Sequence, residues 1–109
     1  MILRLFYATP HPGAGAELNR KLRTESIALA TSQKGMVACA AAGSALDGRD
    51  SLFLTIWGDS NALDRFAGPD HRRSVLPDGY APLLEDHHVV HRPVLALRLP
   101  TLGSTSSSR

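Results

Sequence analysis

A histidine and two arginines in the middle of the chain, His71, Arg72 and Arg73, carry the side chains best suited to chemistry. An imidazole titrates near neutral pH, so His71 is suited to take a proton from a phenol. The guanidinium of Arg72 could hold an anion or stabilise a developing enolate or phenolate. Solvated loop residues are the alternative for both. We therefore treat His71 as a candidate base and Arg72 as a candidate charge stabiliser.

Aromatic residues spread along the chain could surround an apolar ligand. Trp57 is the one tryptophan, and it could form a pocket wall while its indole N–H donates a hydrogen bond. Packing in the core or in a dimer is the alternative role for Trp57. Four further side chains are candidates for contact with a substrate, namely Tyr7, Phe66, Tyr80 and His91.

Three histidines near the end of the chain, His87, His88 and His91, suggest a metal site at first sight. On a strand His87 and His91 share one face but lie about 13 Å apart, and His88 takes the other face. Metal–nitrogen bonds of about 2.1 Å cannot bridge that gap. The single cysteine, Cys39, allows no intrachain disulfide and no thiolate cluster. We therefore expect neither a metal nor another cofactor.

The elements that must position these residues follow the order strand, helix, strand, strand, helix, strand. Branched and aromatic residues indicate a strand at 51–57, and apolar residues at helical spacing indicate a helix at 16–31. Asp47-Gly48 is typical of a hairpin turn, which makes 36–46 the partner of 51–57 despite its alanines. The remaining predictions are a strand at 2–8, a helix at about 60–68 and a strand at 87–98 that Pro93 places at an edge or a bulge.

This order predicts an α+β ferredoxin-like fold, βαββαβ, with two helices on one face of a four-stranded antiparallel sheet. A strand with one wet face alternates apolar and polar residues, but strand 51–57 is apolar at almost every position. Two helices cover one face only, and a large exposed apolar face marks an interface. We therefore expect a homodimer that packs sheet against sheet in two-fold symmetry.

Composition and charge exclude several classes of protein. Apolar residues make up 43% of the 109 residues, the usual share for a globular chain. The net charge is +2 and the basic residues are scattered, so we expect no nucleic-acid partner. No apolar run approaches the roughly 20 residues of a membrane span, and we expect neither a membrane partner nor a signal peptide. The single cysteine fits a cytoplasmic location.

Residues 53–66, Phe-Leu-Thr-Ile-Trp-Gly-Asp-Ser-Asn-Ala-Leu-Asp-Arg-Phe, resemble the signature region of antibiotic-biosynthesis monooxygenase domains. In that family a strand ending in Trp is followed by a short polar link, a Leu…Phe helix and a His. Here Trp57, Leu63, Phe66 and His71 match this pattern in order. The resemblance covers about residues 1–98, which we take as one domain followed by a disordered Ser/Thr-rich tail at 99–109.

The resemblance implies a dimeric α+β barrel with a pocket between the helices and the sheet of each protomer. Some relatives oxygenate polycyclic phenols there with dioxygen and no metal or flavin, whereas others bind and degrade haem. The haem-degrading branch places an Asn on the first strand, where this chain has Tyr7. That departure counts against haem chemistry.

Together the residues and the resemblance favour a cofactor-independent monooxygenase acting on a small aromatic or quinol substrate. In this interpretation His71 is the base, Arg72 stabilises charge, and Trp57 and Tyr7 form the pocket wall. Two alternatives stay open: a non-catalytic binding or structural dimer whose own side chains fill the pocket, and a haem-binding or haem-degrading protein with His71 as axial ligand. Cavity volume separates the first two, because a packed core leaves no room for a drug-sized ligand.

Overall fold

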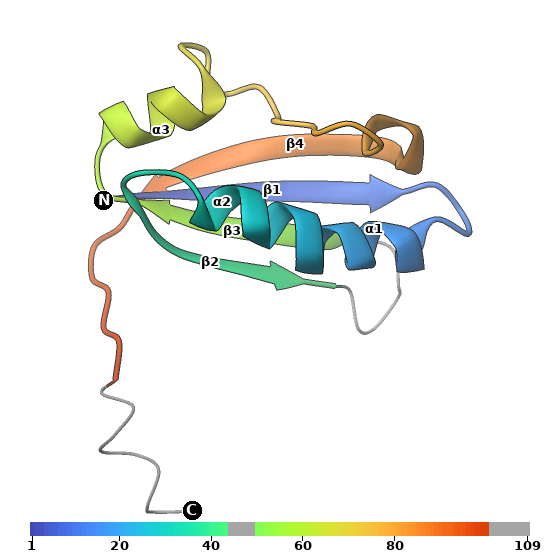
Figure 1. Ribbon diagram of the computed structural model, residues 1–109, viewed down its shortest axis with the longest axis horizontal. Coiled ribbons are helices and arrows are strands. Elements are labelled where there is room, and N and C mark those ends of the chain that lie inside the picture. The colour runs from blue at the N-terminus through green and yellow to red at the C-terminus, as the bar shows by residue number, and fades with distance from the viewer. Residues whose placement is uncertain (44–49, 101–109) are drawn as a thin grey trace, which may run out of the picture.

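Helices and an irregular segment lie against one side of a four-stranded antiparallel sheet (Figure 1). The computed structural model describes residues 1–43 and 50–100. Its strands are β1 (Ile2–Pro10), β2 (Met36–Ala42), β3 (Ser51–Trp57) and β4 (Leu84–Pro93). Its helices are α1 (Gly15–Lys21), the π-helical turn η1 (Leu22–Ser26), α2 (Ile27–Thr31), α3 (Ser60–Ala67) and the 3-10 turn η2 (Ala81–Leu83). The predicted ferredoxin-like α+β fold is confirmed.

The strands lie in the order β2-β3-β1-β4, and every neighbouring pair is antiparallel. Strand β1 is therefore central, with Leu5 opposite Leu54 of β3 on one side and Val90 of β4 on the other. Strand β4 is an edge strand, which is where a strand ending in a proline is tolerated.

Alternation along β1 divides its side chains between the two faces of the sheet. Arg4, Phe6 and Ala8 are buried on the face that the helices cover. Leu3 and Leu5 are only partly buried, because no helix covers the opposite face. The same division holds in β3, where Phe53 and Thr55 are buried against the helices. The helix-covered face is therefore the one able to hold an internal site.

The predicted first helix is present but is not a regular α-helix throughout. Leu18 and Leu22 are buried one turn apart, as its helical spacing requires, and Ala30 continues this face in α2. A π-helical turn, η1, separates α1 from α2 and includes Ser26. Such turns often occur at functional sites, and Ser26 faces the cavity described below.

Helix α3, Ser60–Ala67, lies within the predicted range of about 60–68. The Asp59 carboxylate accepts a hydrogen bond of 2.9 Å from the backbone N–H of Ala62, which caps the helix. The helix ends at Gly68, whose φ of +83° suits glycine. Its buried residues, Ala62 and Leu63, pack on Trp57 at the end of β3.

The last strand differs from its prediction. It runs from Leu84 to Pro93, three residues earlier than the predicted start and five earlier than the predicted end at 98. Pro93 pairs with Ile2 at the last position of the β1–β4 ladder, and Val94 then donates to the Met1 carbonyl. Beyond that bond the chain leaves the sheet, and Leu95 is 95% exposed. The prediction of a strand to residue 98 was wrong. It relied on the apolar residues after Pro93, which have no partner strand because the ladder with β1 ends at Ile2.

Two further predictions concern segments that the structure does not describe. Strand β2 ends at Ala42, before the Asp47-Gly48 turn that predicted the hairpin, and this turn lies outside the described residues. Most of the predicted tail, residues 101–109, also lies outside them. No helix in the described parts of the chain combines the length and the hydropathy that a membrane span requires.

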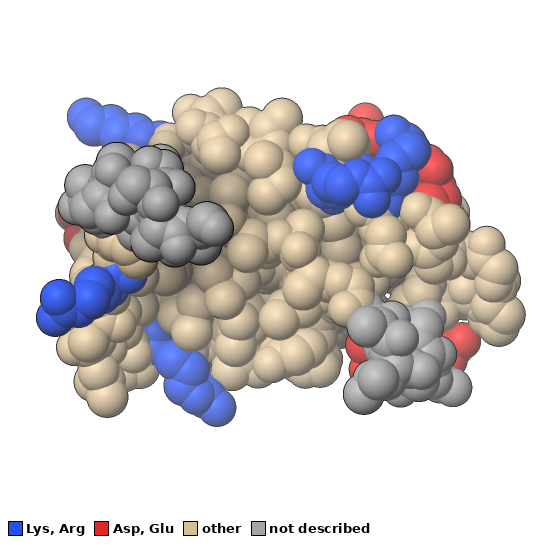
Figure 2. Space-filling view, turned by 90° about the horizontal axis from the view of Figure 1, so that it is seen from below, with Lys and Arg blue, Asp and Glu red and all other residues tan. Residues whose placement is uncertain are grey.

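The open face of the sheet is mainly apolar over β1, β2 and β3, whereas β4 adds His88 and Arg92 to Val90. The register places side chains from neighbouring strands side by side on this face, and Tyr7 stacks on His88 with ring centroids 4.8 Å apart. Figure 2 views the molecule from the β2 edge of the sheet and not onto its open face; mainly uncharged residues occupy the visible middle. This open face consists of Leu3, Leu5 and Tyr7 of β1, Ala38, Ala40 and Ala42 of β2, Leu52, Leu54 and Ile56 of β3, and His88, Val90 and Arg92 of β4.

Gly35, in the turn before β2, lets α3 approach the sheet. Its φ is +86°, and a Cβ placed there would lie 2.5 Å from the Cβ of Ala62. We expect Gly35→Ala to lower the free energy of unfolding by about 1–2 kcal/mol through its backbone conformation, plus ~1–3 kcal/mol through the clash. Urea unfolding followed by circular dichroism measures this loss.

Gly13→Ala is the matched control, because Gly13 has the same φ of +86° and no atom within 4 Å of a Cβ placed there. Gly13→Ala should lower the free energy of unfolding only by the part that comes from the backbone conformation. Equal losses in the two variants would contradict the packing of α3 on this turn.

Candidate functional site

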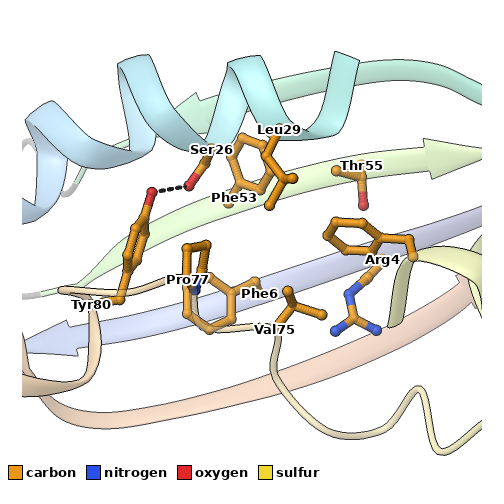
Figure 3. Close-up of a pocket in the computed structure, with 10 residues that line it drawn as sticks. Arg4, Phe6, Ser26, Leu29, Phe53, Thr55, Val75, Pro77 and Tyr80 are labelled. Carbon is orange, nitrogen blue, oxygen red and sulfur yellow. Dashed lines mark hydrogen bonds between the residues drawn. The ribbon is translucent and has the colours of Figure 1, made fainter. Parts of the chain in front are cut away.

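A cavity lies between the sheet, the helical turns η1 and α2, and residues 68–80, which connect α3 to η2 (Figure 3). We call residues 68–80 the connecting segment. The cavity holds about 30 Å³ of space for water within a hollow of about 440 Å³ that includes open solvent. It is lined by Arg4, Phe6, Ser26, Leu29, Phe53, Thr55, Phe66, Val75, Pro77 and Tyr80.

The walls of the cavity are mainly apolar and aromatic. Phe6 and Phe53 rise from the neighbouring strands β1 and β3 at directly paired positions, and Phe66 comes from α3. Val75 and Pro77 of the connecting segment close another side. Flat rings and branched side chains of this kind suit a planar, apolar ligand.

The Tyr80 hydroxyl closes one end of the cavity through two hydrogen bonds. It lies 2.7 Å from Ser26 Oγ and donates over 3.1 Å to the Lys21 carbonyl. Burial raises the pKa of Tyr80, so its hydroxyl stays protonated and available as a donor. Because both hydroxyls are already engaged, Tyr80 contributes mainly its ring to the wall.

Arg4 occupies the opposite end of the cavity from Tyr80 (Figure 3). Its side chain points to the helix-covered face because it alternates with Leu3 and Leu5 along β1. Its Nη1 donates over 2.6 Å to the backbone carbonyl of His71, and its Nη2 donates over 2.8 Å to that of Arg73. These bonds tie the connecting segment to the centre of the sheet.

The positive charge of Arg4 is buried without a carboxylate partner. The residue is 3% exposed, and its guanidinium carbon lies 5.8 Å from the centroid of the Phe66 ring. Among residues 1–43 and 50–100 Arg4 takes part in no ion pair. Burial lowers the pKa of Arg4 to about 10, so the side chain remains charged at neutral pH.

Two histidines extend from Arg4 toward the surface. The Nε2 of His91 lies 3.0 Å from Arg4 Nη1, and the rings of His91 and His71 meet edge to face with centroids 5.0 Å apart. Burial, reinforced by the charges of Arg4 and His71, lowers the pKa of His91. A neutral His91 can accept the Arg4 hydrogen bond at Nε2.

His71 forms the outer member of this group. Its Nδ1 lies 3.1 Å from the Asp64 carboxylate, and its side chain is 38% exposed. A carboxylate at Nδ1 favours a proton on that nitrogen and leaves Nε2 free to accept one. His71 does not line the cavity but lies beside the Arg4 end of it.

The structure does not bring all of the predicted site residues together. Phe66 and Tyr80 line the cavity, and His71 and His91 lie beside Arg4. Trp57 is fully buried behind Phe66, with ring centroids 4.8 Å apart, and its Nε1 donates to Thr55 Oγ1. This position fits the alternative of core packing for Trp57.

Arg72 and Tyr7 lie away from the cavity. The Arg72 side chain is 86% exposed and hydrogen-bonds to Asp70, within the connecting segment. Tyr7 belongs to the open face of the sheet and stacks on His88. Their predicted functional roles therefore gain no support from their positions.

Sequence reasoning missed Arg4 as a site residue. The sequence did contain a signal for Arg4. It is the one charged residue in the strand Ile2–Pro10, and its side chain lies on the same face of the strand as that of Phe6. A buried charge in a strand needs a reason, and a site is one such reason. The contacts with carbonyls almost 70 residues away could not be read from the chain.

The three histidines of β4 have separate surroundings. His87 lies 2.7 Å from Ser74 Oγ, His88 stacks on Tyr7, and His91 contacts Arg4. The described ranges, 1–43 and 50–100, contain no group of three or more His, Cys, Asp or Glu side chains arranged to hold a metal ion.

Solved structures resemble this fold over most of the chain. No protein-family model matches the sequence, and no curated protein matches it. PA3566 from Pseudomonas aeruginosa is 24% identical, with a TM-score of 0.69 over 87% of this chain and 94% of that one. SnoaB from Streptomyces nogalater, a cofactor-independent oxygenase solved as a variant, is 16% identical, with a TM-score of 0.65 over 88% of this chain and 94% of that one.

A third structure, from Nitrosomonas europaea, is described as a candidate antibiotic biosynthesis monooxygenase. It is 14% identical, with a TM-score of 0.71 over 88% of this chain and all of that one. At identities this low the likeness concerns the backbone and not the site. The chain therefore has the fold of structures described as antibiotic biosynthesis monooxygenases, as its sequence resemblance predicts.

Proposed function

We propose that this protein is a cofactor-independent monooxygenase that oxidises a small aromatic or quinol substrate in the cavity between its helices and its sheet. The observation that carries the proposal is the aromatic cavity itself, with Phe6, Phe53 and Phe66 around a narrow apolar space. The fold, shared with a structure named as a cofactor-independent oxygenase, is consistent with this use.

The proposed reaction needs no electron donor other than the substrate. Loss of a proton gives a phenolate with carbanion character, which passes an electron to dioxygen. Recombination forms a carbon–oxygen bond, and the resulting hydroperoxide loses water to leave a carbonyl group. In balance, a CH₂ group and O₂ become a C=O group and H₂O.

His71 is the proposed proton acceptor in this reaction. The Asp64 carboxylate orients its ring, and the exposed edge of the pair gives the proton a route to solvent. His71 lies beside the Arg4 end of the cavity, not in its wall, so a bound substrate must reach toward that end.

A substrate would have to displace part of the cavity wall. A space of about 30 Å³ holds one or two water molecules, not an aromatic ring. Val75 and Pro77 belong to the connecting segment, which has no regular secondary structure and few backbone hydrogen bonds of its own. Its outward movement is the simplest way to admit a ring, because the strands and helices need not change.

Dioxygen uptake tests the proposed reaction directly. We expect the protein to accelerate oxygen consumption by one or more members of a panel of anthrones and naphthalene diols, with no added cofactor. His71→Ala should slow this rate by about 10²-fold or more, the usual contribution of a general base. An oxygen electrode, with the uncatalysed rate subtracted, gives the measurement.

His11→Ala is the matched control, since His11 is an exposed histidine in the turn after β1. It should leave the rate unchanged. Trp57→Phe should lower stability more than rate, because Trp57 packs behind Phe66. Uptake no faster than the spontaneous reaction across the panel would contradict the monooxygenase proposal.

A non-catalytic binding or structural dimer is the second candidate, and the small cavity volume favours it. In that case the side chains around Arg4 and Phe66 would stay packed. Failure of every aromatic probe to bind would support it over the enzyme. No specific observation among the described residues favours haem, and His71, its candidate axial ligand, lies beside the cavity and not in its wall.

Both candidates include a homodimer through the open face of the sheet. Leu5, Leu54 and Val90 meet at the centre of this face, on three neighbouring strands. The alanines of β2 leave room for another sheet to approach closely. Burial of such a face against a second copy removes apolar surface from water, at roughly 25 cal/mol per Å².

A charge at the centre of the open face should disrupt the dimer. We expect Leu54→Glu to convert the protein to a monomer, because two carboxylates would be buried near the two-fold axis. Sedimentation velocity gives the oligomeric state. Ala28→Glu, on the exposed side of α2, adds the same charge and should leave the dimer intact. A monomeric parent protein, or a dimeric Leu54→Glu, would contradict this interface.

A further inference from the structure

Arg4 carries a buried charge that no carboxylate in the described part of the chain neutralises. Removal of an ion from water is expensive unless a partner of opposite charge compensates for it. No carboxylate among the described residues pairs with Arg4, and the nearest titratable neighbour, His91, offers a neutral nitrogen. The cavity end therefore holds an excess positive charge when it is empty.

The guanidinium also has hydrogen-bonding capacity to spare. It carries five N–H groups. The bonds to His71, His91 and Arg73 use both protons of Nη1 and one of Nη2. Within residues 1–43 and 50–100 no acceptor takes the Nε proton or the second Nη2 proton, and Arg4 lines the cavity. Two N–H groups from one planar guanidinium match the geometry of an oxygen anion.

We propose that Arg4 is the oxyanion site of the cavity, so that the protein binds small aromatic ligands as anions, with the ionised oxygen on Arg4 and the ring against Phe6, Phe53 and Phe66. This inference rests on the proposed use of the cavity for an aromatic ligand. It assigns to Arg4 the charge-stabilising role that sequence reasoning gave to Arg72.

The groups around Arg4 explain why an anion would be favoured there. Phe66 covers the guanidinium on the α3 side, and Thr55 is its neighbour on β3. His91 faces it from β4, and His71 and Arg73 face it from the connecting segment with their carbonyls. The carboxylate of Asp64 contacts the ring of His71. An incoming oxyanion thus meets one full positive charge in a shielded site, where electrostatic attraction is strong.

A chromogenic phenol tests the proposal without turnover. 4-Nitrophenol changes colour when it ionises, and nitrobenzene is a neutral analogue without the hydroxyl. In excess wild-type protein, below pH 10 where Arg4 stays protonated, the pKa of 4-nitrophenol should fall by about one pH unit. That shift corresponds to about tenfold tighter binding of the anion than of the neutral phenol.

Substitution of Arg4 should remove or weaken the preference for the anion, while the phenylalanines that contact the ring stay in place. Arg4→Gln should bind both forms of 4-nitrophenol equally, whereas nitrobenzene should bind as to the wild type. Arg4→Lys keeps the charge and loses the planar fork, so it should retain part of the shift. If Arg4→Gln fails to fold, as urea unfolding would reveal, the Arg4→Lys titration decides. Arg72→Gln, the matched loss of charge outside the cavity, should behave as the wild type.

Three results would overturn the proposal: an unshifted pKa with nitrobenzene bound, a shift retained in full by the folded Arg4 variants, or a shift abolished by Arg72→Gln. The assay also separates this inference from the monooxygenase proposal. If the protein prefers the phenolate but does not catalyse oxygen uptake, the oxyanion site is supported and the monooxygenase proposal is refuted. Catalysed uptake without this preference refutes the oxyanion site and supports the enzyme. Failure of both probes to bind also refutes the oxyanion site, and the oxygen-uptake measurement then decides on the monooxygenase by itself.

Discussion

The buried guanidinium of Arg4 holds the connecting segment against the sheet. It rises from the central strand β1 and donates to two backbone carbonyls of the connecting segment, which has no regular structure to fix its own position. Those bonds set where Val75 and Pro77 lie, and therefore where the cavity wall stands. The buried charge of Arg4, which pairs with no carboxylate among the described residues, thus lies at one end of this cavity.

The sheet serves two purposes because its strands are apolar on both faces. On one face Phe6 and Phe53 form the floor of the cavity. On the other, Leu5 and Leu54 belong to an apolar surface that the helices leave uncovered. Dimerisation through that surface would hold β1 from behind and so stabilise the position of Arg4. In the proposed dimer, the interface and the cavity would both depend on β1.

Much of the fold could be predicted from the sequence, because the spacing of apolar residues and the residue types typical of turns depend only on neighbouring positions in the chain. The strand at 51–57 and the helix at about 60–68 match their predictions, whereas the apolar residues after Pro93 suggested a strand that lacks a partner. The site was harder to predict. Phe66 and Tyr80 line the cavity as expected, but Arg4 depends on carbonyls far away in the chain. The functional roles of His71, Arg72 and Trp57 stay predictions.

A crystal structure of the protein with 4-nitrophenol, grown above the pKa of the bound phenol, tests the central claim most directly. We predict that the ring lies between Phe6 and Phe66, that its oxygen accepts hydrogen bonds from Arg4, and that Val75 and Pro77 have moved outward to admit it. A ligand bound elsewhere, or one in the cavity with its oxygen turned away from Arg4, would contradict the account.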